Sequence, residues 1–152
     1  MVREGVTARD ARDSALIALR EELGARYRHE AFVLPEPTLN LGRIAGGDSA
    51  NRICGECVLD LDVRLVPGME IDDVRIRIRA AAEQALAGSG LTLTVTPLFE
   101  GTPAYELPGG SELLRVAEGL TGEGARTVAF GTEAPYLAAL GMEAIVLGPG
   151  GI

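Results

Sequence analysis

The stretch from Thr38 to Arg64 reads TLNLGRIAGGDSANRICGECVLDLDVR, and its pattern gives the strongest indication of the fold of the chain. Residues 53–66 alternate apolar and polar side chains, which is typical of a β-strand with one buried face. The apolar side holds Cys57, Leu59, Leu61, Val63 and Leu65, and the polar side holds Glu56, Asp60, Asp62 and Arg64. Residues 38–44 form another extended run, and residues 46–49 between the runs are of the types that turns require. The stretch therefore predicts a β-hairpin.

Two side chains of this hairpin are candidates for binding a small molecule. Asn51 lies where the connecting loop returns to the sheet, and Arg64 lies on the polar face of the second strand. A guanidinium matches the two oxygens of a carboxylate, and an amide can donate to an oxygen. A solvated strand face with an asparagine in a turn fits the same pattern. The spacing alone leaves both interpretations open.

The segments around the hairpin predict an α+β layer. Apolar residues recur at helical spacing over residues 10–26 and 71–87, and they alternate over residues 91–96. The resulting order of helix, strand, strand, helix and strand is a ferredoxin-like split βαβ arrangement whose first strand is absent. The exposed sheet edge would need cover from residues 1–7, from another chain, or from natural sequence outside this one. We expect this layer to occupy residues 1–98.

The remaining residues, 99–152, have a different character. After a passage rich in Pro and Gly, a helix at 111–120, a strand at 126–130, a helix at 133–140 and a strand at 144–147 are expected. Alternating strands and helices with Gly-rich junctions are typical of a parallel α/β sheet. So few elements predict only part of such a sheet.

The junction at Gly131, Thr132 and Glu133 is a second candidate binding position. It lies where a predicted strand passes into a helix, the place where α/β sheets commonly bind ligands. Backbone N–H groups at a helix start attract anions, and Thr132 adds a hydroxyl. Glu133 can bind a substrate amine, or it can simply favour the helix dipole. The residues leave these alternatives open.

Several separate motifs of the chain resemble the acetylornithine deacetylase family, in the same order and over residues 19–152. The matching motifs are PTLNLG at 37–42, GGDSANRIC at 46–54, DVR at 62–64, PGM at 67–69 and TEAPY at 132–136. This family belongs to the zinc-dependent amidohydrolase superfamily, with succinyl-diaminopimelate desuccinylase, aminoacylase and related carboxypeptidases. The resemblance implies that the first layer is a lid and dimerisation domain and that the later residues belong to a catalytic α/β domain.

The resemblance also implies an activity and this chain's share in it. Full-length members hydrolyse N-acyl amino acids, such as N-acetylornithine in arginine biosynthesis, with two zinc ions, and they dimerise through the lid. Residues matching Asn51 and Arg64 help to bind substrate, in some members across the dimer, while those matching Gly131 and Thr132 line the pocket. The resemblance favours the substrate-binding role for Glu133. No metal ligand or catalytic residue of the family matches this chain. We therefore expect a fragment that binds no zinc by itself and does not catalyse alone.

The composition restricts the class of protein and its partners further. The chain has 152 residues, a net charge of −8 and 47% hydrophobic residues, which is enough to bury a core. Phosphate binding needs an excess of Lys and Arg, so the acidic charge opposes a nucleic-acid or anionic-membrane partner. The N-terminus lacks the apolar segment of a signal peptide, and no apolar run is long enough to span a bilayer. We expect a cytoplasmic protein.

Cys54, Cys57 and His29 are the remaining reactive side chains. The cysteines form a Cys-x-x-Cys pair, which can indicate redox chemistry or half of a zinc site. On one strand, an offset of three residues would point the two side chains to opposite faces, so we interpret them as structural or incidental thiols. His29 is the single histidine, and a metal site needs several ligands. We interpret it as a surface or structural residue.

A rival hypothesis comes from another class of protein. The same α+β layer would suit a free-standing ferredoxin-like module that dimerises or binds a small molecule such as an amino acid. A stable dimer that binds an amino acid without metal would favour this alternative.

Overall fold

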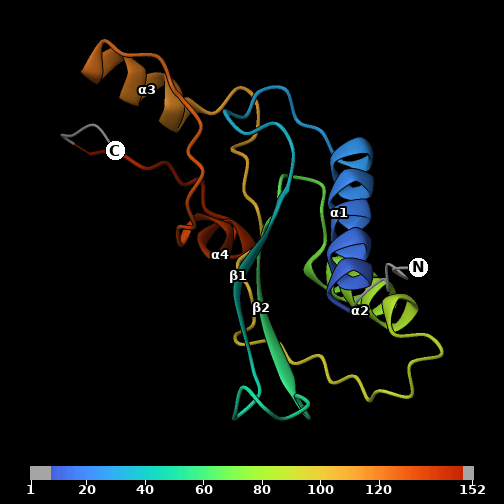
Figure 1. Ribbon diagram of the computed structural model, residues 1–152. Coiled ribbons are helices and arrows are strands. Elements are labelled where there is room, and N and C mark those ends of the chain that lie inside the picture. The colour runs from blue at the N-terminus through green and yellow to red at the C-terminus, as the bar shows by residue number, and fades with distance from the viewer. Residues whose placement is uncertain (1–7, 149–152) are drawn as a thin grey trace.

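The computed structural model describes residues 8–148, with side chains from residue 15 onward. Its elements are α1 (Ala8–Arg26), β1 (Thr38–Gly46), β2 (Cys57–Arg64), α2 (Ile71–Ala85), α3 (Glu112–Thr121) and α4 (Ala134–Ala139). Figure 1 shows the β1–β2 hairpin with α1 and α2 on one side and with α3 and α4 on the other. The chain is α+β, and the helix–hairpin–helix order of its first part is of the predicted ferredoxin-like type.

The hairpin is antiparallel, and a bulge keeps its apolar side chains on one face. Leu41 pairs with Leu61. Gly42 then has no partner, so the next pair is Arg43 with Asp60. A one-residue bulge shifts the alternation of the strand by one position. Ile44 therefore lies on the same face as Leu41, while Arg43 lies on the polar face with its guanidinium 3.5 Å from the Asp60 carboxylate.

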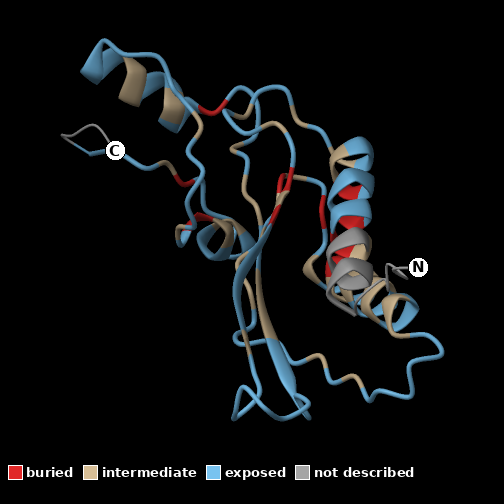
Figure 2. Cartoon of the chain, viewed as in Figure 1, coloured by how far each residue is buried: buried red, intermediate tan, exposed pale blue. Residues whose placement is uncertain are grey.

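A small apolar core fills the space between the hairpin and the first two helices. Its buried side chains are Leu16, Leu19, Leu23, Leu39, Val66, Met69 and Val74. The three leucines of α1 recur at helical spacing, and Leu23 is the most deeply buried at 1% exposed. Figure 2 shows the buried positions of α1 on its hairpin side, whereas the hairpin tip is exposed. The core therefore holds one end of the hairpin, and the tip extends beyond it.

Gly46 lies at the tip, at a position where a side chain does not fit. A Cβ there would lie 2.4 Å from the backbone oxygen of Glu56, and 3.0 Å from both the Cys54 Sγ and the Cys57 Cα. Gly46→Ala is expected to lower the free energy of unfolding by about 1–3 kcal/mol, measured by urea denaturation. Gly55→Ala is the matched control, because a Cβ at Gly55 meets no atom within 4 Å. Equal losses in the two variants would contradict this explanation.

Helix α3 is capped at both ends. The side chain of Ser111 accepts a hydrogen bond from the Leu114 N–H at 3.1 Å. Gly122 follows the last turn with φ of 71°, and its N–H donates to the Glu118 carbonyl. These caps confirm the predicted helix within one residue at each end.

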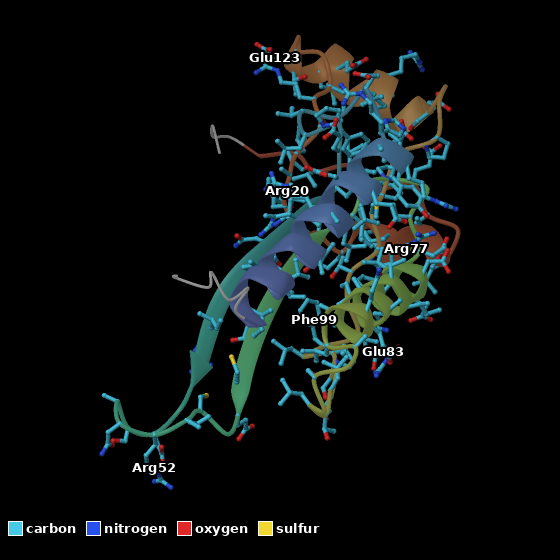
Figure 3. All side chains as sticks on the ribbon, turned by 45° about the vertical axis from the view of Figure 1, so that its right-hand side comes forward. Arg20, Arg52, Arg77, Glu83, Phe99 and Glu123 are labelled. Atoms are coloured by element: carbon cyan, nitrogen blue, oxygen red, sulfur yellow. The ribbon has the colours of Figure 1, made fainter. Side chains whose placement is uncertain are left out.

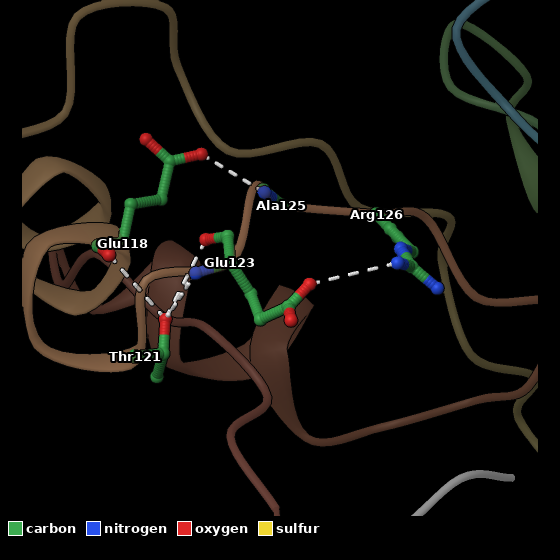
Figure 4. A network of polar contacts seen from close by, with 5 residues as sticks. All are labelled: Glu118, Thr121, Glu123, Ala125 and Arg126. Carbon is green, nitrogen blue, oxygen red and sulfur yellow. Dashed lines mark hydrogen bonds and ion pairs between the residues drawn. The ribbon is translucent and has the colours of Figure 1, made fainter.

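A polar network beyond α3 fixes the direction in which the chain leaves the helix (Figure 4). The Glu118 carboxylate accepts a hydrogen bond from the Ala125 N–H at 2.9 Å. The Glu123 N–H donates to the Thr121 hydroxyl at 3.3 Å, and the Glu123 carboxylate lies 3.7 Å from the Arg126 guanidinium. The chain then runs toward the candidate binding junction.

Three predicted strands are wrong. Residues 91–96, 126–130 and 144–147 form no ladder, and the sheet of the described residues has two strands. Within the first of these segments Val95 is still half-buried, but its carbonyl accepts a hydrogen bond from Arg79 at 3.1 Å instead of from a strand. An alternating pattern indicates that one face of a segment is buried, whereas a strand also needs hydrogen bonds to a neighbouring backbone. The pattern does not show whether such a neighbour exists.

The second strand also begins later than predicted. β2 starts at Cys57, and residues 53–56 belong to the loop. The Gly47 N–H donates to the Glu56 carbonyl at 3.3 Å and closes this loop just before the ladder. Cys54 is therefore a loop residue. The prediction that both cysteines lie on one strand, with side chains on opposite faces, is wrong.

The predicted helices agree with the structure apart from their ends. α1 begins two residues earlier than predicted, and α2 ends two residues earlier. None of the helices in residues 8–148 has the length and apolar character needed to cross a membrane. The predicted role of residues 1–7 at the sheet edge lies outside the described residues.

Candidate substrate-binding site

Arg64 lies at the base of the hairpin and contacts the later part of the chain. It pairs with Thr38 across the sheet, so it is at the opposite end from the connecting loop. Its Nη1 donates to the Ala129 carbonyl at 2.9 Å, and its Nε donates to the Asp62 carboxylate at 3.2 Å. Ala129 is two residues before Gly131. Tertiary folding therefore brings the predicted arginine to the predicted junction.

The junction itself is an open turn that leads into α4. The Thr132 hydroxyl accepts a hydrogen bond from the Ala134 N–H at 3.2 Å, and its own hydrogen can still be donated to a ligand. Glu133 is exposed, and its side chain makes no capping hydrogen bond. Because α4 has only six residues, the hydroxyl is a stronger feature of this turn than the helix dipole.

A second segment supports the junction from behind. The Tyr136 hydroxyl donates to the Gly101 carbonyl at 3.0 Å. A Cβ placed on Gly131 would lie 4.0 Å from the side chain of Thr102. The turn is therefore held against residues 101–102, which the sequence did not single out.

Arg64 and the turn at residues 131–133 form what we call the base cluster. Within one chain, Asn51 is not part of it. It lies at the tip of the hairpin, where its Oδ1 accepts a hydrogen bond from the Ser49 hydroxyl at 2.6 Å. The adjacent Arg52 pairs with Asp48 at 2.7 Å, and Figure 3 places Arg52 at the end of the hairpin far from the helices. β2 has eight residues, so roughly 20 Å of strand separates the tip from Arg64.

The cluster at the base has the chemistry to bind an amino-acid-like molecule. Arg64 and the Thr132 hydroxyl are donors suited to a carboxylate, and Glu133 is an acceptor suited to an amine. In the described part of the chain, no three His, Cys, Asp or Glu side chains are grouped so that they could hold a metal ion. These residues therefore do not fit a zinc site, and we assign no step of zinc chemistry to them.

Two shallow hollows on the described surface lie elsewhere. One is between α1 and residues 36–37, and the other is between the start of α2 and residues 100–103. None of the predicted binding residues lines either hollow. The side chains of Arg64 and Glu133 are exposed within this chain.

His29 connects the loop after α1 with the later segment. Its Nε2 lies 2.9 Å from the Glu106 carboxylate, its ring packs edge-on against Phe32, and its Nδ1 is buried without a hydrogen-bond partner. Nearby, the Val33 N–H donates to the Thr127 hydroxyl at 2.9 Å. His29 thus has a structural contact. Glu106 and Thr127 are single polar residues in irregular segments, so no sequence pattern identified their role.

The chain belongs to the peptidase dimerisation domain family, whose sequence profile matches residues 7–89. The match covers α1, the hairpin and α2, and it confirms the dimerisation domain inferred from the motifs.

The relatives extend the match beyond that domain. The acetylornithine deacetylase of Vibrio atlanticus is 43% identical over 138 residues, which are 91% of this chain and 36% of the relative. The acetylornithine deacetylase of Proteus mirabilis is 43% identical over 137 residues, and that of Salmonella arizonae is 42% identical over 137 residues. The chain thus spans about a third of the length of these relatives.

The similarity also bears on the rival hypothesis. A free-standing lid module would resemble its relatives only as far as the dimerisation domain. Here the similarity covers 91% of the chain and so includes most of the segment after that domain. The free-standing module is therefore not favoured.

Proposed function

We propose that this chain is the lid and dimerisation portion, with an adjoining part of the catalytic domain, of a zinc-dependent amide hydrolase. The substrate class is N-acyl amino acids such as N-acetylornithine, and the setting is arginine biosynthesis in the cytoplasm. Residues 1–98 serve as the lid domain, and residues 99–152 belong to the catalytic domain. The proposal is supported by the dimerisation family and by the similarity to acetylornithine deacetylases.

One observation carries the proposal within the structure. Arg64 of the hairpin donates to the Ala129 carbonyl at 2.9 Å, although 65 residues separate them. This contact supports the proposal, because a guanidinium can bind a carboxylate and Ala129 is only three residues before Thr132 in the chain. In our proposal, Arg64 binds the substrate carboxylate, the turn lines the pocket and Glu133 faces the substrate amine.

Asn51 has a different role in this proposal. Its position at the exposed hairpin tip, away from Arg64, suits a residue that reaches the site of a second protomer. Dimerisation through the lid would then complete each site with one amide from the partner. The structural contribution of this chain is binding, orientation of substrate and closure of the site.

In our proposal, the zinc ions and the water that they activate belong to the rest of the enzyme. No group of three His, Cys, Asp or Glu side chains in residues 8–148 could hold a metal ion, so we assign polarisation of the amide and activation of water to residues outside this chain. We therefore expect no zinc-dependent hydrolysis by the isolated chain.

A chimeric enzyme tests the proposal. The matching 138-residue region of the Vibrio atlanticus acetylornithine deacetylase is replaced by this chain, and release of ornithine from N-acetylornithine is measured with and without a chelator. We expect chelator-sensitive hydrolysis by a dimeric chimera and none by the chain alone. A relative in which the same region is deleted serves as the control.

Two results would overturn the proposal in different ways. A folded, dimeric chimera that hydrolyses no N-acyl amino acid would contradict the assigned function. Chelator-sensitive turnover by the isolated chain would contradict the assignment of the hydrolytic step to other residues.

A further inference from the structure

Cys54 and Cys57 flank the point at which the hairpin loop meets its second strand. Both are exposed in the structure. Cys54 lies in the loop, and its thiol donates to the Glu56 carbonyl with the sulfur 2.7 Å from the oxygen. Cys57 is the first residue of β2 and pairs with Gly46 of β1. The thiol of Cys54 is thus turned toward the backbone that leads into Cys57.

The geometry around Gly46 bounds the distance between the two cysteines. A Cβ on Gly46 would lie 3.0 Å from the Cys54 Sγ and 3.0 Å from the Cys57 Cα, so these two atoms are at most 6.0 Å apart, twice that distance. A disulfide needs the two sulfurs about 2.05 Å apart, and the Cys54 sulfur already lies within 6.0 Å of the Cys57 Cα. The spacing is therefore short enough for a bridge to form by small movements of the loop and side chains.

We propose that Cys54 and Cys57 form a reversible disulfide that closes the hairpin tip, by exchange with a small-molecule disulfide of the glutathione type. In the first step one cysteine thiolate attacks a sulfur of the oxidant, forming a mixed disulfide and releasing one small thiol. The second cysteine then attacks the sulfur of the first, and the other small thiol leaves. The two cysteine sulfurs supply two electrons, the oxidant is reduced to two thiols, and the protons of the cysteines pass to them.

The bridge would constrain the loop that carries Asn51. Without it, the loop is closed by the Gly47 N–H and the Cys54 thiol, which both donate to the Glu56 carbonyl at 3.3 and 2.7 Å. The disulfide replaces the hydrogen bond of the Cys54 thiol, because the S–H proton is lost when the bridge forms. It thereby restricts residues 47–56. This inference does not depend on the proposed enzymatic function, because it concerns the chemistry of the chain itself.

The test is a redox titration of the purified chain in mixtures of reduced and oxidised glutathione. After alkylation of the remaining thiols, intact mass and peptide mapping report the fraction in which Cys54 is joined to Cys57. We expect the equilibrium constant for the bridge to be at least about tenfold larger for the native chain than for the chain in concentrated urea, because the folded loop holds the Cys54 sulfur close to the backbone of Cys57. Cys54→Ser and Cys57→Ser serve as controls, each expected to retain one mixed disulfide with glutathione.

Three outcomes would overturn the inference. They are an equilibrium constant no larger in the native chain than in urea, persistent glutathione on both cysteines, and a bridge that joins two chains. A second measurement is hydrogen exchange, in which oxidation should slow the amides of residues 47–56 several-fold and leave α1 unchanged. Unchanged exchange in that loop would refute the constraint on Asn51.

Discussion

Arg64→Ala is expected to lower kcat/KM of the chimeric enzyme for N-acetylornithine by about 10- to 100-fold. A hydrogen bond to a charged group contributes about 1.5–3 kcal/mol, and each 1.4 kcal/mol corresponds to a factor of ten. The side chain also donates to the Ala129 carbonyl, so its removal loosens the junction that carries Thr132. Both effects weaken binding at the same place.

A substrate analogue separates these two effects. In N-acetylornithine amide the carboxylate is replaced by a neutral group, so the charge-assisted pair with Arg64 is missing from the start. We expect Arg64→Ala to reduce kcat/KM for the amide by less than about threefold. An equal loss on both substrates would show that Arg64 acts only through the structure of the junction.

Arg43→Ala provides the matched control. Arg43 lies on the same polar face of the sheet, and it pairs with Asp60 at 3.5 Å as Arg64 pairs with Asp62 at 3.2 Å. Within the described residues it makes no hydrogen bond or ion pair with the later segment. Its removal should change kcat/KM by less than about twofold, because exposed ion pairs contribute little.

Leu23→Ala is expected to lower the free energy of unfolding by about 2–5 kcal/mol. Leu23 is 1% exposed and belongs to the core cluster between α1, the hairpin and α2. Truncation removes the transfer free energy of the side chain and leaves a cavity, which together have this magnitude. Native domains are stable by only about 5–15 kcal/mol, so the loss is a large part of the total.

Urea denaturation followed by circular dichroism measures this effect. With a slope of about 2 kcal/mol per molar urea, the midpoint should fall by about 1–2.5 M. Ile17→Ala is the control, because Ile17 lies on the same helix but is 56% exposed, and it should change stability by less than about 0.5 kcal/mol. A similar loss in both variants would contradict this explanation, because Ala is the better helix former at both positions and burial would then not determine the loss.

The local elements of the fold were predictable because their signals are local. The leucines of α1 recur at helical spacing, the hairpin alternates strictly over β2, and Ser111 marks the start of α3. Each of these features depends on residues within a few positions of one another. The three failed strands show the limit, since an alternating segment becomes a strand only beside another backbone.

The candidate site was predictable only in part. The residue types and motifs identified Asn51, Arg64 and the Gly131–Glu133 turn, and their roles as substrate ligands remain predictions. The sequence also misplaced Cys54, because a strand that begins at Cys57 cannot be distinguished by alternation from one that begins four residues earlier. Because Cys54 lies in the loop and not on the strand, a disulfide with Cys57 is compatible with the structure.

The α+β class, the hairpin, the four helices and the family resemblance could all be predicted from the amino-acid sequence. Each of these follows from short-range periodicity, from capping residues or from ordered motifs. Three features were visible only in the folded chain. Arg64 donates to the Ala129 carbonyl, His29 pairs with Glu106, and Asn51 lies at the hairpin tip, away from Arg64. The physical reason is that these contacts join residues far apart in the chain, often through backbone atoms that every residue shares, so no side-chain pattern marks them in advance.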